Sequence, residues 1–91
     1  MASFFYGVAA VPTVLRWHGH RFYFFSHEGT EPPHIHVDMA GCSAKFWLEP
    51  VALARNRGYS DRDLNRLSDR IIEQQQELLR AGHDHFPDDR G

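Results

Sequence analysis

The stretch that decides the fold is HIHVDMAGCSAKFWLE, residues 34–49. Apolar and polar side chains alternate on both sides of Ala40-Gly41, which is the pattern of two half-buried strands joined by a tight turn. A two-residue loop at 40–41 pairs Ile35 with Phe46. It also pairs Val37 with Ala44, so both apolar sets lie on one face of the hairpin, as a half-buried sheet requires.

The same register predicts a candidate functional site on the other face. It sets His36 opposite Lys45 and His34 opposite Trp47. Two histidines two residues apart on a strand project outward from one side, about 6.6–7 Å apart at the backbone. The segment EPPHIHV, residues 31–37, therefore carries the strongest functional signal in the chain.

Upstream of this hairpin, the sequence predicts two more strands. Residues 13–17 are β-branched and aromatic, His18-Gly19-His20 provides a simple turn, and residues 21–26 form the second strand. Phe22 and Phe24 then face one side of it, with Tyr23 and Phe25 on the other. Gly29 and the Pro32-Pro33 pair interrupt the pattern before His34.

Downstream, the pattern becomes helical. Pro50 suits the first turn of a short helix that ends at Gly58, and Ser60 then caps a longer helix that ends at Gly82. The apolar stripe of the long helix consists of Leu64, Leu67, Ile71 and Leu78, widened by Ile72 and Leu79. The fold class expected is α+β: an antiparallel β-meander of about four strands followed by a short and a long C-terminal helix packed on one face.

A basic stripe runs along the long helix. Arg62, Arg66 and Arg70 recur every four residues, but acidic residues on the same helix largely neutralise them. We expect a solvated face with intrahelical ion pairs rather than a surface for nucleic acid.

Length and composition indicate one domain. The chain has 91 residues with a net charge of −2, so it lacks the basic balance of an autonomous DNA-binding protein. We expect an N-terminal extension at 1–11, a single α+β domain at 12–86 and a polar tail at 87–91. The apolar start is too short to span a bilayer, and no basic residue precedes it as in a signal peptide. With a lone cysteine, Cys42, this favours a cytoplasmic protein that is neither secreted nor membrane-bound.

Several stretches resemble a family of small prokaryotic proteins known as domain of unknown function 4160. They are residues 12–16, 21–26, 28–29, 31–37 and 44–50, together with Leu64-Asn65. The resemblance implies that the chain is one partner of a two-gene, toxin–antitoxin-like cassette. It therefore implies a small protein partner encoded by an adjacent gene.

Three uses of the candidate site stay open. In the leading one, the histidines are structural or contact that partner, and the interaction face carries His34, His36, Lys45 and Trp47. In the second, an RNase-like enzyme uses His34 and His36 as acid and base, and Lys45 stabilises the charge on phosphate. Additional binding residues in these two readings are Tyr23 and Trp47, which could stack an RNA base, and the loop carboxylates Glu28 and Glu31.

The third use is a divalent metal site. His34 and His36 could close on one ion. The remaining ligands would have to come from His27, Glu28, Asp38 or Glu49. No spacing enforces that set, so no cofactor is predicted outright.

Overall fold

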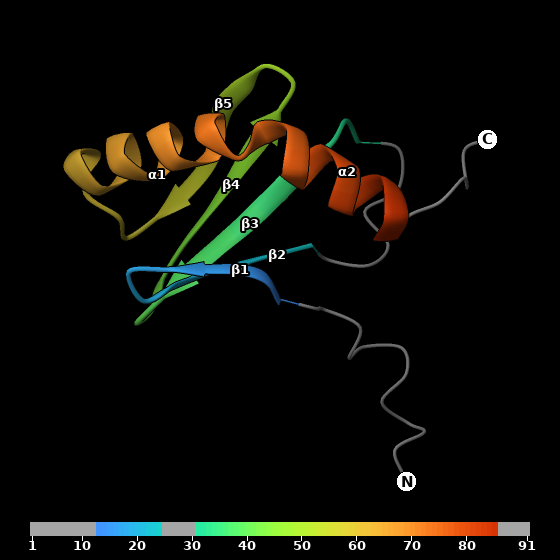
Figure 1. The fold of residues 1–91 in the computed structure, drawn as a ribbon. Coiled ribbons are helices and arrows are strands. Elements are labelled where there is room, and N and C mark those ends of the chain that lie inside the picture. Colours follow the sequence, from blue (N-terminus) through green and yellow to red (C-terminus); the bar gives the residue numbers. More distant parts are fainter. Residues whose placement is uncertain (1–12, 25–30, 86–91) are drawn as a thin grey trace, which may run out of the picture.

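The computed structural model describes residues 13–24 and 31–85, which form five strands and two helices. The strands are β1 (Thr13–Trp17), β2 (His20–Tyr23), β3 (His34–Met39), β4 (Cys42–Leu48) and β5 (Val51–Arg57). The helices are α1 (Asp61–Glu73) and α2 (Gln75–His85). All five strands belong to one antiparallel sheet in the order β1-β2-β3-β4-β5 (Figure 1). The predicted α+β class is confirmed, with five strands in place of about four.

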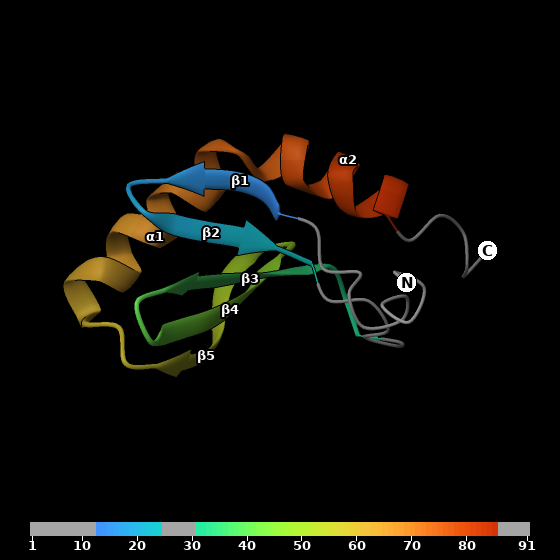
Figure 2. The same ribbon diagram turned by 90° about the horizontal axis from the view of Figure 1, so that it is seen from below.

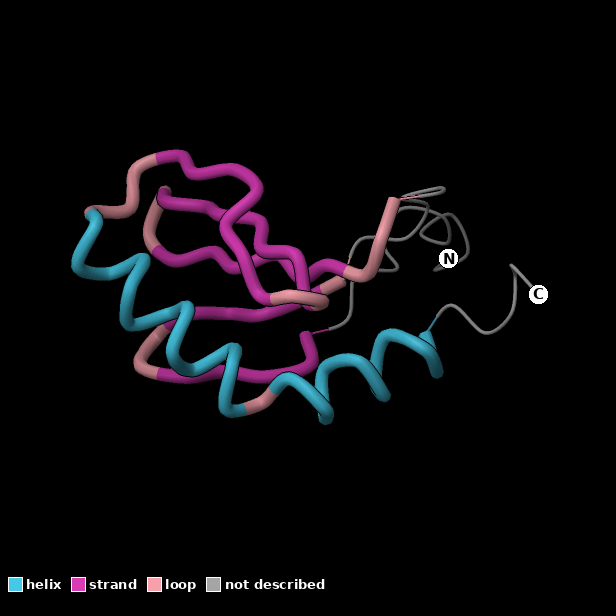
Figure 3. The backbone as a smooth tube through the Cα atoms, turned by 90° about the horizontal axis from the view of Figure 1, so that it is seen from above, coloured by secondary structure: helices cyan, strands magenta, loops and turns pink. Residues whose placement is uncertain are grey.

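The two helices cover one face of the sheet, which we call the helix face (Figures 2 and 3). The core lies between these two layers, because the inward positions of the strands and the apolar stripe of the helices are buried together. Its members are Phe22, Phe24, Ile35, Val37, Ala44, Phe46, Leu48, Tyr59, Leu64, Leu67, Ile71 and Leu78.

The β3–β4 hairpin has the predicted register. His34 pairs with Trp47, Ile35 with Phe46, His36 with Lys45, Val37 with Ala44 and Met39 with Cys42. Its turn has positive φ at both central residues, 47° at Ala40 and 87° at Gly41. This backbone matches the twist of the strands it joins, which explains why two residues suffice.

The β1–β2 hairpin uses the same kind of turn. His18 has φ 50° and Gly19 has φ 83°, but His20 is the first residue of β2 rather than part of the turn. Phe22 and Phe24 lie on one side, as predicted, and that side is the buried core. Tyr23 lies on the opposite face, paired with His36. The prediction for Phe25 falls outside the described residues.

The prediction of a short helix after Pro50 is wrong. Residues 51–57 form β5, which pairs antiparallel with β4 after a turn at Glu49-Pro50, whose peptide bond is cis. Alanine, leucine and arginine favour helix in isolation, but the backbone hydrogen bonds that β4 offers outweigh this weak preference. Gly58, with φ 95°, follows the strand instead of ending a helix.

The long C-terminal helix is likewise two helices. Its start is as predicted: the Oγ atom of Ser60 accepts a hydrogen bond from the Asp63 amide at 3.1 Å. The expected stripe of Leu64, Leu67, Ile71 and Leu78 is buried. However, α1 ends at Glu73, and α2 starts at Gln75 and continues past Gly82 to His85. Ile72, expected to widen the stripe, is exposed.

The backbone of Leu48 joins three parts of the fold. Its N–H group donates to the Pro33 carbonyl at 3.0 Å, in the segment before β3. Its carbonyl accepts from the Gln75 side-chain amide at 2.7 Å, at the start of α2. The end of β4 is therefore hydrogen-bonded to the Pro-Pro segment and also to the helical layer.

The predicted extension at 1–11 and the tail at 87–91 lie outside the described residues, and the domain limits of 12–86 stay a prediction. Within the described ranges, neither helix has the length and apolar character needed to cross a membrane.

Candidate functional site

The sheet face opposite the helices carries polar and aromatic side chains in cross-strand rows, and we call it the polar face. Residues directly opposite each other in a ladder project to the same side. One row consists of Arg16, Arg21, Asp38, Ser43 and Arg57; the next consists of Thr13, Tyr23, His36, Lys45 and Arg55; the third consists of His34, Trp47 and Ala52.

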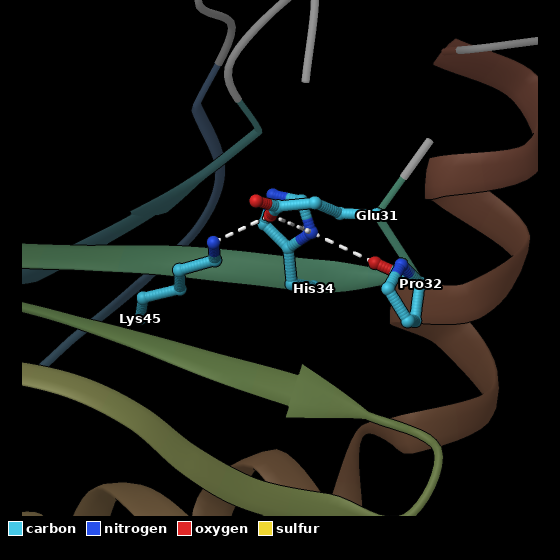
Figure 4. Close-up of polar contacts among 4 residues, drawn as sticks. All are labelled: Glu31, Pro32, His34 and Lys45. Carbon is cyan, nitrogen blue, oxygen red and sulfur yellow. Dashed lines mark hydrogen bonds and ion pairs between the residues drawn. The ribbon is translucent and has the colours of Figure 1, made fainter. Parts of the chain in front are cut away.

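His34 is fixed by the Pro-Pro segment. Its Nδ1 atom lies 2.8 Å from the carbonyl oxygen of Pro32 (Figure 4). A carbonyl can only accept a hydrogen bond, so Nδ1 carries the proton and donates it. In the neutral ring this leaves Nε2 as the basic nitrogen, the one that can take a proton or bind a metal.

His36 lies in a series of ring contacts. Its ring meets that of His34 edge-on, with centroids 5.3 Å apart, and stacks on Tyr23 at 5.4 Å. The Tyr23 hydroxyl donates to Oδ2 of Asp38 at 2.9 Å. On the far side of His34, the Trp47 ring lies edge-on at 5.8 Å. The four rings thus form one continuous aromatic row that holds both imidazoles in place.

Lys45 connects this row to the segment before β3. Its Nζ atom donates to Oε1 of Glu31 at 2.5 Å (Figure 4). The same atom lies 4.9 Å from the centre of the Trp47 ring. The same carboxylate oxygen lies 3.8 Å from Nδ1 of His34. The hydrogen bond from Lys45 is the main cause that lowers the pKa of Glu31 below its ordinary value. Glu31 and Lys45 therefore form a charged pair at physiological pH.

Most of the predicted site residues come together. His34, His36, Lys45, Trp47, Tyr23 and Glu31 lie along β2, β3, β4 and the segment before β3, in mutual contact. The rings lie on the predicted face, where neighbouring side chains largely cover them. His34 is only 9% exposed and His36 only 8%. Glu28 lies outside the described residues.

The described residues supply no further ligands that would complete a metal site with His34 and His36. Within residues 13–24 and 31–85, no group of three or more His, Cys, Asp or Glu side chains could hold an ion. Asp38 accepts a hydrogen bond from Tyr23, and Glu49 is exposed in the β4–β5 turn. His27 lies outside the described residues.

Sequence reasoning missed a third buried histidine, His20. Its Nδ1 atom is 3.0 Å from the Tyr59 hydroxyl, on the helix face. Burial is the main cause that lowers the pKa of His20, and burial also raises the pKa of the Tyr59 hydroxyl. The alternation His20, Phe22, Phe24 was the available signal, because it places His20 on the core side of its strand.

The arginine stripe of α1 differs partly from expectation. Arg70 forms the expected kind of ion pair, with Glu73 at 3.1 Å. However, the guanidinium groups of Arg66 and Arg70 also lie 5.7 Å and 5.5 Å from the centre of the Trp17 ring. These arginines therefore also cover an aromatic side chain at the end of β1.

The fold and the polar face define a small α+β domain in which a five-stranded meander carries two helices on one face. The family model "Domain of unknown function (DUF4160)" matches residues 19–81, so the chain belongs to this family, as the sequence resemblance indicated. The match spans β2 to most of α2 and includes the aromatic row with Lys45. No curated protein and no solved structure matches the chain.

Proposed function

We propose that this chain is a cytoplasmic partner-binding protein, one member of a toxin–antitoxin-like pair, that contacts a small protein encoded by an adjacent gene through its polar face. The observation that carries the proposal is the exposed Glu31 and the partly exposed Trp47, which a partner can reach. The largely buried Tyr23, His36, His34 and Lys45 hold these two side chains in place. The helices pack on the other face of the sheet and contribute nothing to this group.

The side chains of the polar face are of the kinds that supply binding energy in protein interfaces. Tryptophan, tyrosine and arginine are the residue types most enriched among interface residues that matter energetically. Trp47 and Tyr23 are held by ring contacts, and Arg21 lies 4.4 Å from the centre of the Tyr23 ring. Because these rotamers are already fixed, ordering them on binding costs little conformational entropy.

The test is a binding measurement with the product of the adjacent gene. The two purified proteins should form a complex, and Trp47→Ala should weaken it by about tenfold or more, as removal of a central aromatic residue does. Arg80→Ala is the matched control, because Arg80 lies on α2 and is exposed. Circular dichroism of both variants checks that they fold. Failure of the wild-type proteins to associate at micromolar concentration would contradict the proposal.

A second candidate function, cleavage of RNA, is favoured by the adjacency of the imidazoles. The rings of His34 and His36 are 5.3 Å apart and Lys45 is paired with His36. One imidazole would take the proton of a ribose 2′-hydroxyl as its oxygen attacks phosphorus. The other, as imidazolium, would protonate the departing 5′-oxygen, which leaves a 2′,3′-cyclic phosphate. Lys45 would stabilise the charge on the phosphate oxygens if it gave up its hydrogen bond to Glu31 and bound the substrate phosphate instead.

RNA incubation separates this candidate from the first. Cleavage by wild type in the presence of EDTA that is lost in both His34→Ala and His36→Ala supports catalysis. Equal cleavage by all three proteins would identify a contaminant and remove the candidate. A Glu31→Gln variant adds a direct check, because it releases Lys45 and should raise the rate if the lysine acts on phosphate.

A further inference from the structure

The strand β5 is an edge of the sheet with an unused side. It pairs with β4 on one side only, and the sheet ends there. Six of its seven residues are exposed. In the part of the chain that the structure describes, no backbone group hydrogen-bonds to its outer side. An edge of this kind presents alternating N–H and C=O groups to any extended segment that lies beside it.

The two faces of β5 differ in chemistry. The register shifts between Lys45 and Phe46, so Arg55 pairs with Lys45 whereas Leu53 pairs with Phe46. Arg55 and Arg57 therefore lie on the polar face, and Leu53 lies on the helix face although it is only two residues from Arg55. A strand added to this edge would meet cations on one side and apolar surface on the other.

The apolar side is hollowed. A depression of about 400 Å³ lies between β5 and α1, lined by Phe46, Leu53, Asp61, Leu64, Asn65 and Ser68. Its apolar lining comes from Phe46, Leu53 and Leu64, and Leu53 is 45% exposed. An apolar side chain seated there would bury Leu53 and extend the core by one strand.

On the cationic side, the described residues leave both arginines, Arg55 and Arg57, without a direct ion pair, although the charge of Arg55 is felt by the Glu31 carboxylate. Their β4 neighbours, Lys45 and Ser43, bring no negative charge. Carboxylates on an added strand would therefore lie opposite two exposed guanidinium groups, a pairing that favours the strand in one register.

We infer that β5 is the docking edge for an extended segment of a partner protein in which apolar and acidic side chains alternate. The apolar side chains enter the hollow beside Leu53, and the acidic ones pair with Arg55 and Arg57. This inference rests on the proposed partner-binding function and names the mode of recognition, which is addition of a strand to the sheet. A second copy of the chain fits less well, because its β5 would bring arginines against arginines.

The test uses a labelled heptapeptide in which glutamate alternates with valine, titrated with the full chain and followed by fluorescence anisotropy. It should bind at least about tenfold more tightly than the same peptide with lysine in place of glutamate. A proline at its centre should abolish binding, because it removes a backbone donor. Amide shifts in the NMR spectrum on adding the glutamate peptide should concentrate in residues 51–57.

Charge-reversal variants test whether Arg55 and Arg57 determine the preference for the glutamate peptide. Arg55→Glu/Arg57→Glu should reverse the preference toward the lysine peptide. Arg62→Glu/Arg80→Glu, which changes the net charge equally on exposed helix positions, should retain the preference for glutamate. Equal binding of both peptides by wild type would overturn the inference. So would tighter binding of single-stranded polyuridine than of the glutamate peptide, or a wild-type dimer by sedimentation that the glutamate peptide does not dissociate.

The same double variant separates this inference from the proposed function. If the adjacent-gene protein binds wild type and Arg55→Glu/Arg57→Glu equally well, the partner-binding function stands and the β5 edge is not the site. If the glutamate peptide binds as described while that protein binds neither form, the edge stands and the proposed partner is wrong.

Discussion

The Nζ atom of Lys45 in β4 lies 2.5 Å from Oε1 of Glu31, fourteen residues earlier in the chain. Lys45 is 8% exposed, a rare environment for an ammonium group, whereas its partner lies in the exposed segment before β3. The pair therefore holds that segment over the polar face and supplies the counter-charge that makes the burial of Lys45 tolerable.

Replacing Glu31 by glutamine should lower Tm at neutral pH, because the buried ammonium loses its counter-charge. The pKa of Glu31 is lowered in the folded state, so its contribution is present above its ordinary pKa of 4.5 and is lost as pH falls through the folded value. Thermal melts of wild type and Glu31→Gln should therefore converge on acidification. Glu49→Gln, in the exposed β4–β5 turn, should match wild type at neutral pH. A constant difference in Tm across the pH range would contradict this account.

Removal of the Tyr59 hydroxyl should destabilise the fold from the helix face. Tyr59→Phe leaves Nδ1 of His20 without its 3.0 Å partner, and a buried polar group without a hydrogen bond costs about 1–3 kcal/mol. Urea unfolding measures the difference. An unchanged midpoint would show that the hydroxyl contributes nothing to stability.

The same histidine should make the fold sensitive to acid. Burial lowers the pKa of His20 below its ordinary value of 6.5, so the unfolded chain binds this proton more readily than the folded one. Stability should therefore fall as pH drops from above 6.5 toward the folded pKa, and the loss is complete below it. His20→Gln should flatten this part of the curve of unfolding free energy against pH. An identical slope in the variant would assign the acid sensitivity to other groups.

The two sides of α1 should respond differently to truncation. Leu67 is fully buried, so Leu67→Ala should destabilise the domain by about 2–5 kcal/mol through lost contacts and the cavity left behind. Ile72 is 55% exposed, so Ile72→Ala should lie within about 0.5 kcal/mol of wild type. Guanidinium unfolding of both variants gives the comparison. Similar losses would mean that Ile72 is covered in solution.

A substitution in the β3–β4 turn should increase the stability of the fold. Ala40 has φ 47°, a conformation that asparagine adopts more readily than alanine, so Ala40→Asn should stabilise the fold by about 1 kcal/mol. Gly41→Ala should destabilise the fold, because Gly41 has φ 87°, a conformation that alanine adopts only with strain. Thermal unfolding of the two variants should move Tm in opposite directions.

The central hairpin could be predicted from the sequence because its signals are local. Strict alternation sets the two faces, and the residues at 40–41 set the loop length. Together they fix His36 opposite Lys45, and hence most of the candidate site. The start of α1 could be predicted for the same reason, since Ser60 and the Asp63 amide are three residues apart.

Features that depend on distant contacts could not be predicted. β5 has a composition suited to a helix, and only the free edge of β4 makes it a strand. The burial of His34 and His36 depends on how side chains from several strands close over one another, which alternation does not specify. Alternation with Phe22 and Phe24 indicates the core side for His20, but nothing local indicates its hydrogen bond to Tyr59, 39 residues away.

Leu48 links the sheet to the helical layer through hydrogen bonds of its backbone. Its peptide groups bond to Pro33 on one side and to Gln75 of α2 on the other, and the neighbouring Pro32 carbonyl orients His34. A molecule that binds at the histidines and displaces the Pro-Pro segment would therefore strain the hydrogen bond between Leu48 and the start of α2. Amide hydrogen exchange in α2 should therefore report whether a ligand is bound at the histidines, although α2 lies on the opposite face of the sheet.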